Sequence, residues 1–348
     1  PWPAALTGEC VEMQGRAIFF RDYKRAALAL MGLSVVALYG AAIAYPGDRP
    51  ERTDIDWAAL PQVAPEADLV RTEVLDDSMV EVTSVASLRE TLNAANFELK
   101  PIRRGNARVP RLFVEDLPDD FDSRMVVEQR KKAFVRTVLP LILKANEEVR
   151  NERRKLIAIE EQISSGREIS ESSQLWLDNL AEKYRTSPND FVSLLRRVDM
   201  VSPTVALAQS IEESGWGRSR FARHGNALYG QRVWSKGAGF VPGERPEGEK
   251  FEVRAFDSLL DSVRSYVVNL NRHHAYEEYR AVRSRMRALE TSLHWEDLTA
   301  TLINYSERRE AYVETLSGLI RSNRLDQFEA AQLSSTPVEL EDTQLASR

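Results

Sequence analysis

The residues best suited to chemistry are Glu212 and Glu213, two carboxylates at the end of a short apolar segment. Ser202 predicts the capping hydroxyl of a helix, and Pro203 its first residue, where a missing N–H costs nothing. Gly215 predicts its end, because glycine tolerates the left-handed conformation that follows many helices. Glu213 therefore lies in the last turn, where the helix dipole disfavours a negative charge. A carboxyl group whose pKa is raised in this way is suited to act as a general acid at neutral pH.

The segment that contains these carboxylates, Ala-Gln-Ser-Ile-Glu-Glu-Ser-Gly-Trp-Gly-Arg-Ser at 208–219, resembles a known signature. It is similar to the motif of the bacterial glucosaminidases, glycoside hydrolase family 73. The resemblance covers roughly residues 202–325 and extends more weakly back to about 109. Further similar segments lie at 225–230, 253–258 and 305–312, and those at 236–242 and 245–248 are most similar to the Bax subgroup of this family.

The resemblance implies an enzyme that hydrolyses the β-1,4 bonds after N-acetylglucosamine in the glycan strands of peptidoglycan. It implies that Glu213, and not Glu212, is the catalytic acid. Neighbouring helix residues point about 100° apart, so only one of the two faces a cleft. The fold that it implies is lysozyme-like, a helical body and a small β lobe with a cleft between them.

Glycosidases usually place a second carboxylate across the scissile bond, about 5–5.5 Å from the acid in retaining enzymes and about 6.5–9.5 Å in inverting ones. In this family the second glutamate tends to lie on the β lobe, where Glu247 precedes a glycine at an expected hairpin turn. Glu252, expected within a strand, is the alternative. A third route needs no second carboxylate: the acetamido group of the substrate assists its own departure. Tyr305 would then position that group.

Four more residues of the matched segments are candidates for substrate contact: Trp216, Asn226, Tyr229 and Tyr312. Aromatic rings stack on sugars, but at turns they more often belong to a core. Asn226 stands beside a glycine, where an asparagine more often shapes the turn than binds a ligand. Tyr312 follows Tyr305 by seven residues and shares its face if one helix carries both.

Apolar residues at helical spacing predict a mainly α fold. The first expected helix covers 125–163, with Pro140 expected to kink or split it. Glycines cluster between 225 and 256, where short alternating segments predict a small β-hairpin lobe. The fold class is therefore mainly α with a small β lobe (α+β). The other helices are expected at 170–184, 189–198, 203–213, 258–272, 277–289, 295–305 and 309–323.

The amino-terminal part of the chain predicts export. Residues 26–45 carry no charge and are long enough to cross a bilayer, and basic residues precede them. They form either a transmembrane anchor or a cleaved signal peptide, because 42–44 is an Ala-x-Ala pattern. Residues 1–25 are then a cytoplasmic n-region. The rest of the protein would face the periplasm, attached to the inner membrane or released.

The remaining boundaries follow from composition and resemblance. Residues 46–109, rich in acidic residues and proline, predict an extended tether, and the polar residues 329–348 a disordered tail. The glucosaminidase domain is expected at 110–328, with a helical region at 110–200 and the catalytic core at 201–328.

Composition narrows the partners. The net charge of −6 does not indicate a nucleic-acid-binding surface. The chain has one cysteine, and its four histidines are not spaced as metal ligands, so no metal and no other cofactor are expected. Peptidoglycan is the expected partner, with the membrane if 26–45 is retained. Two alternatives stay open beside the hydrolase: a lytic transglycosylase with the same acid, and a scaffold module that binds glycan without turnover.

Overall fold

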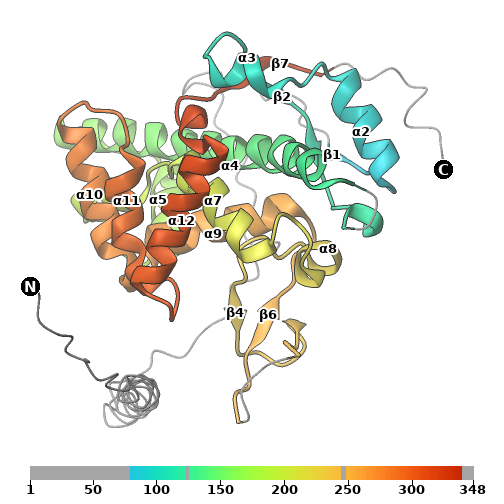
Figure 1. Cartoon of the computed structure of the whole chain (residues 1–348). Helices are drawn as coiled ribbons and strands as arrows, with labels where there is room; N and C mark the ends of the chain where they lie inside the picture. The colour runs from blue at the N-terminus through green and yellow to red at the C-terminus, as the bar shows by residue number, and fades with distance from the viewer. Residues whose placement is uncertain (1–78, 123–124, 244–247, 339–348) are drawn as a thin grey trace, which may run out of the picture. The chain divides into compact units, whose positions relative to one another are not determined.

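The computed structural model describes residues 79–122, 125–243 and 248–338, which form a mainly helical domain (Figure 1). The predicted anchor at 26–45 lies outside these residues. Among the helices that are described, none combines the length and the apolar composition that a membrane span needs. The predicted fold class, mainly α with a small β lobe, is confirmed.

The longest helix is α4, Val127–Ser164, which contributes much of the hydrophobic core. Its middle is almost completely buried, from Phe134 to Val149, and α7 (Pro203–Ser214) and α9 (Leu259–Arg272) pack against it. The sequence predicted that Pro140 would kink or split this helix. The helix runs through Pro140 without a break. Pro140 is itself buried among apolar neighbours, whose packing offsets the hydrogen bond that proline cannot make.

The predicted helix that carries the two carboxylates is confirmed as α7. Ser202 Oγ accepts a hydrogen bond from the N–H of Val205 (3.2 Å), Pro203 is the first residue, and Gly215 closes the helix with a φ of 59°. Most of α7 is buried, between α4, α12 (Glu310–Asn323) and α11 (Trp295–Ala300).

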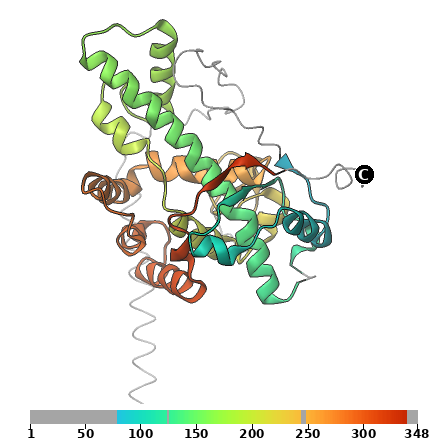
Figure 2. The ribbon, with the colours of Figure 1, turned by 90° about the horizontal axis from the view of Figure 1, so that it is seen from above.

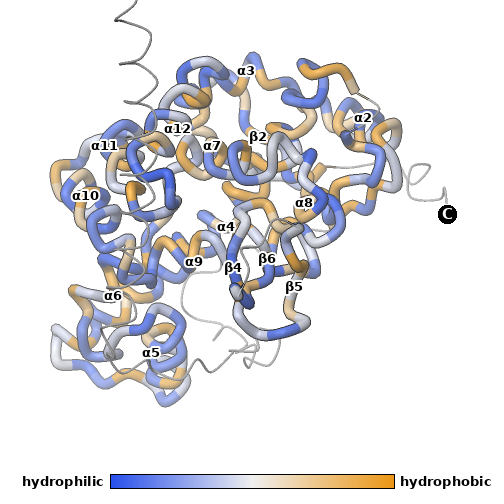
Figure 3. Tube along the Cα trace, turned by 60° about the horizontal axis from the view of Figure 1, so that its bottom comes forward, coloured by the Kyte–Doolittle hydropathy of each residue, from blue (hydrophilic) through white to orange (hydrophobic). Residues whose placement is uncertain are grey.

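Helices α5 (Glu171–Lys183), α6 (Phe191–Arg197) and α10 (Glu277–Ala288) complete the body, close to their predicted ranges. Figure 3 shows hydrophobic and hydrophilic residues alternating along these helices, as expected of amphipathic elements with one face on a core. The segment predicted as one helix at 295–305 is two, because α11 gives way to the 3-10 helix η3 at Thr301–Asn304.

The β lobe is a three-stranded antiparallel sheet in the order β4 (Arg232–Val233), β6 (Glu252–Arg254), β5 (Gly239–Phe240). It follows the short helix α8 (Arg220–Gly225). Gly239 lies so close to β6 that a Cβ there would be 1.9 Å from the carbonyl oxygen of Val253. A glycine is therefore required at this position of the β5–β6 pair.

Two predicted boundaries are wrong. Residues 79–109 are not an extended tether: they form β1 (Met79–Val80), α2 (Val85–Ala94), α3 (Leu99–Arg103) and the start of β2 (Val109–Arg111), and β1 pairs with β3 (Phe113–Val114). Leu88, Leu92, Phe97 and Ile102 join the hydrophobic core. The spacing of Val85, Leu88 and Leu92 does indicate the short helix α2, whereas the five residues of α3 are too few to show a periodic pattern.

The carboxyl-terminal boundary also moves. Strand β7, Leu333–Pro337, pairs in parallel with β2, although this segment was predicted to be disordered (Figure 2). The N–H of Val109 donates to the carbonyl of Gln332 (2.8 Å), and Leu333 is buried. The polar side chains of β7 face outward, so composition alone does not distinguish this edge strand from a disordered tail.

Candidate active site

The carboxyl group of Glu213 lies at the end of α7, between α12 and the turn that leads into the β lobe. It accepts a hydrogen bond from the hydroxyl of Tyr312 in α12. On its other side it lies directly over Gly230, where an added Cβ would be 3.2 Å from Glu213 Oε2. The side chain is half-buried, so the carboxyl group is partly shielded from water and still reachable.

This position changes the acidity of Glu213. Burial raises its pKa to about 7, the hydrogen bond from Tyr312 opposes that rise, and the nearby charge of Glu212 adds to it. A group with this pKa is protonated in a large fraction of molecules near neutral pH. It can therefore donate a proton to a leaving oxygen, which is the task of a general acid.

Glu212 points elsewhere. Its carboxylate forms an ion pair with Arg308, in the loop before α12. The two carboxyl groups therefore have different surroundings: Glu212 is paired with an exposed arginine, and Glu213 is beside Tyr312 and Gly230.

A chain of buried hydrogen bonds leads to Glu213. The hydroxyl of Tyr266 in α9 donates to Gln209 Oε1 (2.7 Å), and Gln209 Nε2 donates to the hydroxyl oxygen of Tyr312 (2.9 Å). Because Tyr312 accepts from Gln209, its own proton is directed to the carboxylate of Glu213. Gln209 stands four residues before Glu213 in α7, so both lie on the helix face that meets α12.

Tyr229, Tyr266, Tyr305 and Tyr312 form a tyrosine cluster beside Glu213. Tyr305 and Tyr312 do not belong to the same helix. Tyr305 follows η3, while Tyr312 belongs to α12, and the two rings stack with centroids 5.5 Å apart and planes at 6°. The hydroxyl of Tyr305 donates to the backbone carbonyl of Tyr229 (3.3 Å). One helix does not carry both tyrosines, so the condition for a shared helix face is not met; the two rings meet from two separate elements.

Three predicted substrate contacts have structural partners. Tyr229 is buried and stacks on Tyr266 at 3.8 Å. Asn226 has a φ of 53° at the end of α8, and its amide donates to Asp116 Oδ1 (2.5 Å), which shapes the turn. Trp216 packs edge-on against Phe134 at 6.0 Å, away from the tyrosine cluster. The structure therefore gives these side chains roles in the fold.

Of the two predicted second carboxylates, the structure describes only Glu252. Glu247 lies outside the described residues. Glu252 is buried, and its carboxylate accepts hydrogen bonds from the N–H groups of Gly237 and Gly239 at 3.0–3.1 Å. These bonds tie the loop of the β lobe to β6 and give Glu252 a structural role in the lobe.

Sequence reasoning missed Gln209, Tyr266 and Gly230. The spacing of Gln209 from Glu213 was a usable signal, because residues four apart share a helix face. Nothing in the sequence places Tyr266 or Gly230 against them. Within residues 79–122, 125–243 and 248–338 no group of three or more His, Cys, Asp or Glu side chains is arranged to hold a metal ion.

Comparison with known proteins places this site in a family. A family model named Glucosaminidase, described as mannosyl-glycoprotein endo-beta-N-acetylglucosaminidase, matches residues 189–325, which include Gln209, Glu213 and Tyr312. Protein bax of Escherichia coli (strain K12) is 30% identical over 201 residues, which is 56% of this chain and 70% of that protein. The catalytic domain of the autolysin Auto from Listeria monocytogenes is 23% identical over 44% of this chain and 80% of that chain, with a TM-score of 0.29.

The similarity to Protein bax extends over more than two thirds of that protein, and the family model spans the residues that surround Glu213. The chain therefore belongs to the glucosaminidase family and is a glycosidase of its Bax type.

Proposed function

We propose that this protein hydrolyses β-1,4 bonds after N-acetylglucosamine in peptidoglycan, with Glu213 as the general acid. The observation that carries the proposal is the environment of Glu213: a half-buried carboxyl group with a pKa of about 7, hydrogen-bonded to Tyr312. The family supplies the glycan substrate class, and the resemblance described above supplies the bond.

In this mechanism the protonated carboxyl group of Glu213 donates its proton to the glycosidic oxygen as the bond to the sugar carbon breaks. Positive charge then develops on that sugar. Either a second carboxylate or the acetamido group of the substrate stabilises this charge. Glu247 is the candidate carboxylate of the chain, since Glu252 is bonded to the backbone of the lobe.

Digestion of purified peptidoglycan, followed by mass spectrometry of the new chain ends, tests the proposal. A reducing N-acetylglucosamine end supports hydrolysis at the proposed bond. An anhydro end would identify a lytic transglycosylase, and the absence of any product would identify a glycan-binding scaffold.

The variant Glu213→Gln provides the control for the assigned acid. Glutamine keeps the shape of the side chain and can still accept a hydrogen bond from Tyr312, but it has no proton to donate. We expect loss of turnover by at least about a hundredfold, the usual contribution of general acid catalysis, with an unchanged melting transition. Normal turnover by this variant would overturn the assignment.

We further propose that the enzyme is exported and acts in the periplasm, on the basis of the uncharged segment at 26–45 and the basic residues before it. Fractionation of cells, with amino-terminal sequencing of the mature protein, tests this. A start after residue 44 indicates a cleaved signal peptide, an intact segment in the membrane fraction indicates an anchor, and recovery from the cytosol would contradict export.

A further inference from the structure

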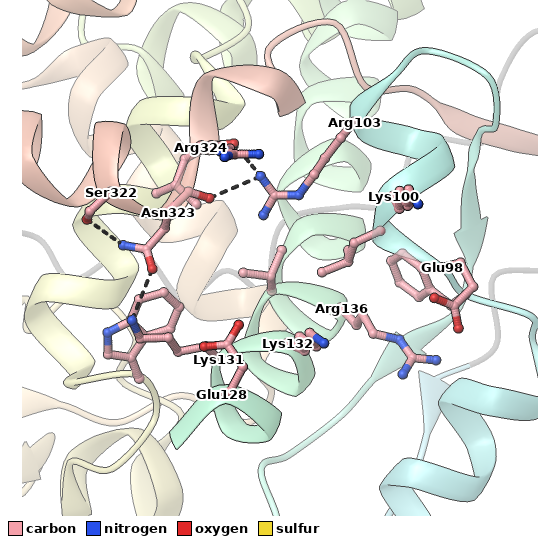
Figure 4. Close-up of a pocket in the computed structure, with 15 residues that line it drawn as sticks. Glu98, Lys100, Arg103, Glu128, Lys131, Lys132, Arg136, Ser322, Asn323 and Arg324 are labelled. Carbon is pink, nitrogen blue, oxygen red and sulfur yellow. Dashed lines mark hydrogen bonds between the residues drawn. The ribbon is translucent and has the colours of Figure 1, made fainter. Parts of the chain in front are cut away.

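A cavity of about 750 Å³ lies between α3, the first turns of α4 and the end of α12 (Figure 4). Its volume is in the range of sites that hold a small molecule. Its lining includes neither Glu213 nor the tyrosines that surround Glu213.

The cavity is strongly basic. Its lining carries six cationic side chains and two carboxylates, Glu98 and Glu128, a formal charge of +4 in a chain whose net charge is −6. The cations are Lys100, Arg103, Lys131, Lys132, Arg136 and Arg324.

In the part of the chain that the structure describes, none of these six cations forms an ion pair. Burial and the neighbouring charge of Arg324 lower the pKa of Arg103, and the charge of Asp326 opposes them. The positive potential of the cavity is therefore available to a ligand.

Some of the cations are fixed and others are free to move. Arg103 donates to the carbonyl oxygens of Asn323 (3.0 Å) and Arg324 (2.5 Å) at the end of α12, and Lys131 donates to Asn323 Oδ1 (3.2 Å). These bonds hold α3, α4 and α12 together around the cavity. Lys100 and Lys132 are exposed and make no hydrogen bond or ion pair within the described residues.

The cavity also has apolar walls, to which Phe97, Leu99 and Val135 contribute. Trp216 completes them, held at 5.0 Å from Lys131 Nζ. A ligand that fits both kinds of lining carries carboxylates and small aliphatic groups together. Inorganic phosphate would make no contact with the apolar wall, and a glycan strand without peptides would leave the cationic side chains unpaired.

Trp216 connects this cavity to the catalytic residue. It follows Glu213 by three positions, so the two backbone sites are at most about 11 Å apart. A polymer bound at Glu213 therefore passes close enough to the cavity for a short side branch to reach it.

We propose that this basic cavity binds the carboxylate-bearing peptides attached to the glycan strand that Glu213 cleaves. This inference rests on the proposed function for the identity of the strand. Lys100 and Lys132 bind the carboxylates, and the apolar wall with Trp216 contacts the aliphatic side chains of the peptide.

The test compares two substrates and measures binding without turnover. The full chain carrying Glu213→Gln is titrated with glycan strands that bear their peptides and with strands from which an amidase has removed them. The same titration is repeated with Lys100→Glu and Lys132→Glu added. The matched control adds Arg167→Glu and Arg285→Glu instead, two exposed residues away from the cavity that change the net charge equally.

We expect the first pair of substitutions to lower the affinity ratio of peptide-bearing to peptide-free strands by about tenfold, since two charge contacts become repulsive. The control pair should leave the ratio at its original value, and the difference should shrink in high salt because the lysines are exposed. An unchanged ratio in the Lys100 and Lys132 variant would overturn the inference.

Failure of the proposed function looks different. If wild-type protein cleaved neither substrate while the affinity ratio still depended on Lys100 and Lys132, peptide binding by the cavity would be supported and the proposed hydrolase activity would be rejected.

Discussion

Removal of one hydroxyl group, by the substitution Tyr312→Phe, should make Glu213 a weaker acid. In the native structure the hydroxyl donates to the carboxylate and so lowers the pKa of Glu213, against the larger effect of burial. Phenylalanine keeps the ring that stacks on Tyr305, so the change removes only the two hydrogen bonds of the hydroxyl, the one to Glu213 and the one accepted from Gln209.

The size of the effect follows from the energy of that bond. A hydrogen bond to a charged group contributes about 1.5–3 kcal/mol, and about 1.4 kcal/mol corresponds to one pH unit. Because Glu213 is partly exposed, we expect the lower part of this range. The activity of a general acid falls as the pH rises through its pKa, so the alkaline limb of kcat/KM should move upward by about one pH unit.

The assay is the pH dependence of kcat/KM on peptidoglycan fragments, together with an NMR titration of the labelled carboxyl carbon of Glu213. The matched control is Tyr279→Phe, which removes a buried hydroxyl bonded to the N–H of Ser202 and not to Glu213. That variant should keep the wild-type limb. A Tyr312→Phe limb that stays in place or moves downward, in a folded protein, would refute this account of the site.

Three further predictions concern packing. Gly230→Ala places a Cβ 3.2 Å from Glu213 Oε2 at a φ of 58°, so turnover should fall and the free energy of unfolding should drop by about 1 kcal/mol. A turnover assay and calorimetry measure the two effects, and wild-type behaviour in both would refute the prediction. Glu252→Gln weakens the bonds to the loop of the β lobe, and hydrogen exchange at Gly237 and Gly239 should become faster; unchanged protection would contradict the role assigned to Glu252. Leu88→Ala should lower the free energy of unfolding by about 2–5 kcal/mol, whereas an extended tether would show no loss.

The sequence predicted the helix of the acid well because its limits are set locally. Ser202, Pro203 and Gly215 each act on the backbone within one turn, and the structure places all three as expected. That Glu212 and Glu213 have different surroundings could also be predicted, since neighbouring residues of one helix point about 100° apart.

The sequence predicted less where contacts join distant segments. Strand β7 is stabilised by its pairing with β2, more than two hundred residues earlier in the chain. No local pattern in 333–337 predicts that pairing. The same holds for Gln209 and Tyr266, whose hydrogen bond links α7 to α9. A ring that stacks on a sugar and a ring that packs in a core look alike in sequence, so the stacking of Tyr229 on Tyr266 could not be predicted.

The Gly-Trp-Gly turn explains why residues of one motif perform different tasks. Gly215, Trp216 and Gly217 all have left-handed backbones, with φ values of 59°, 62° and 76°, so the chain reverses within three residues after Glu213. A Cβ at Gly217 would meet Phe121 at 2.9 Å, which shows how tightly this turn is packed. The reversal leaves Glu213 at the end of α7 beside Tyr312 and turns Trp216 toward α4 and the basic cavity. Substitution at Gly217 should therefore disturb both sites together, whereas Tyr312→Phe changes only the hydrogen bonds around Glu213 and Gln209.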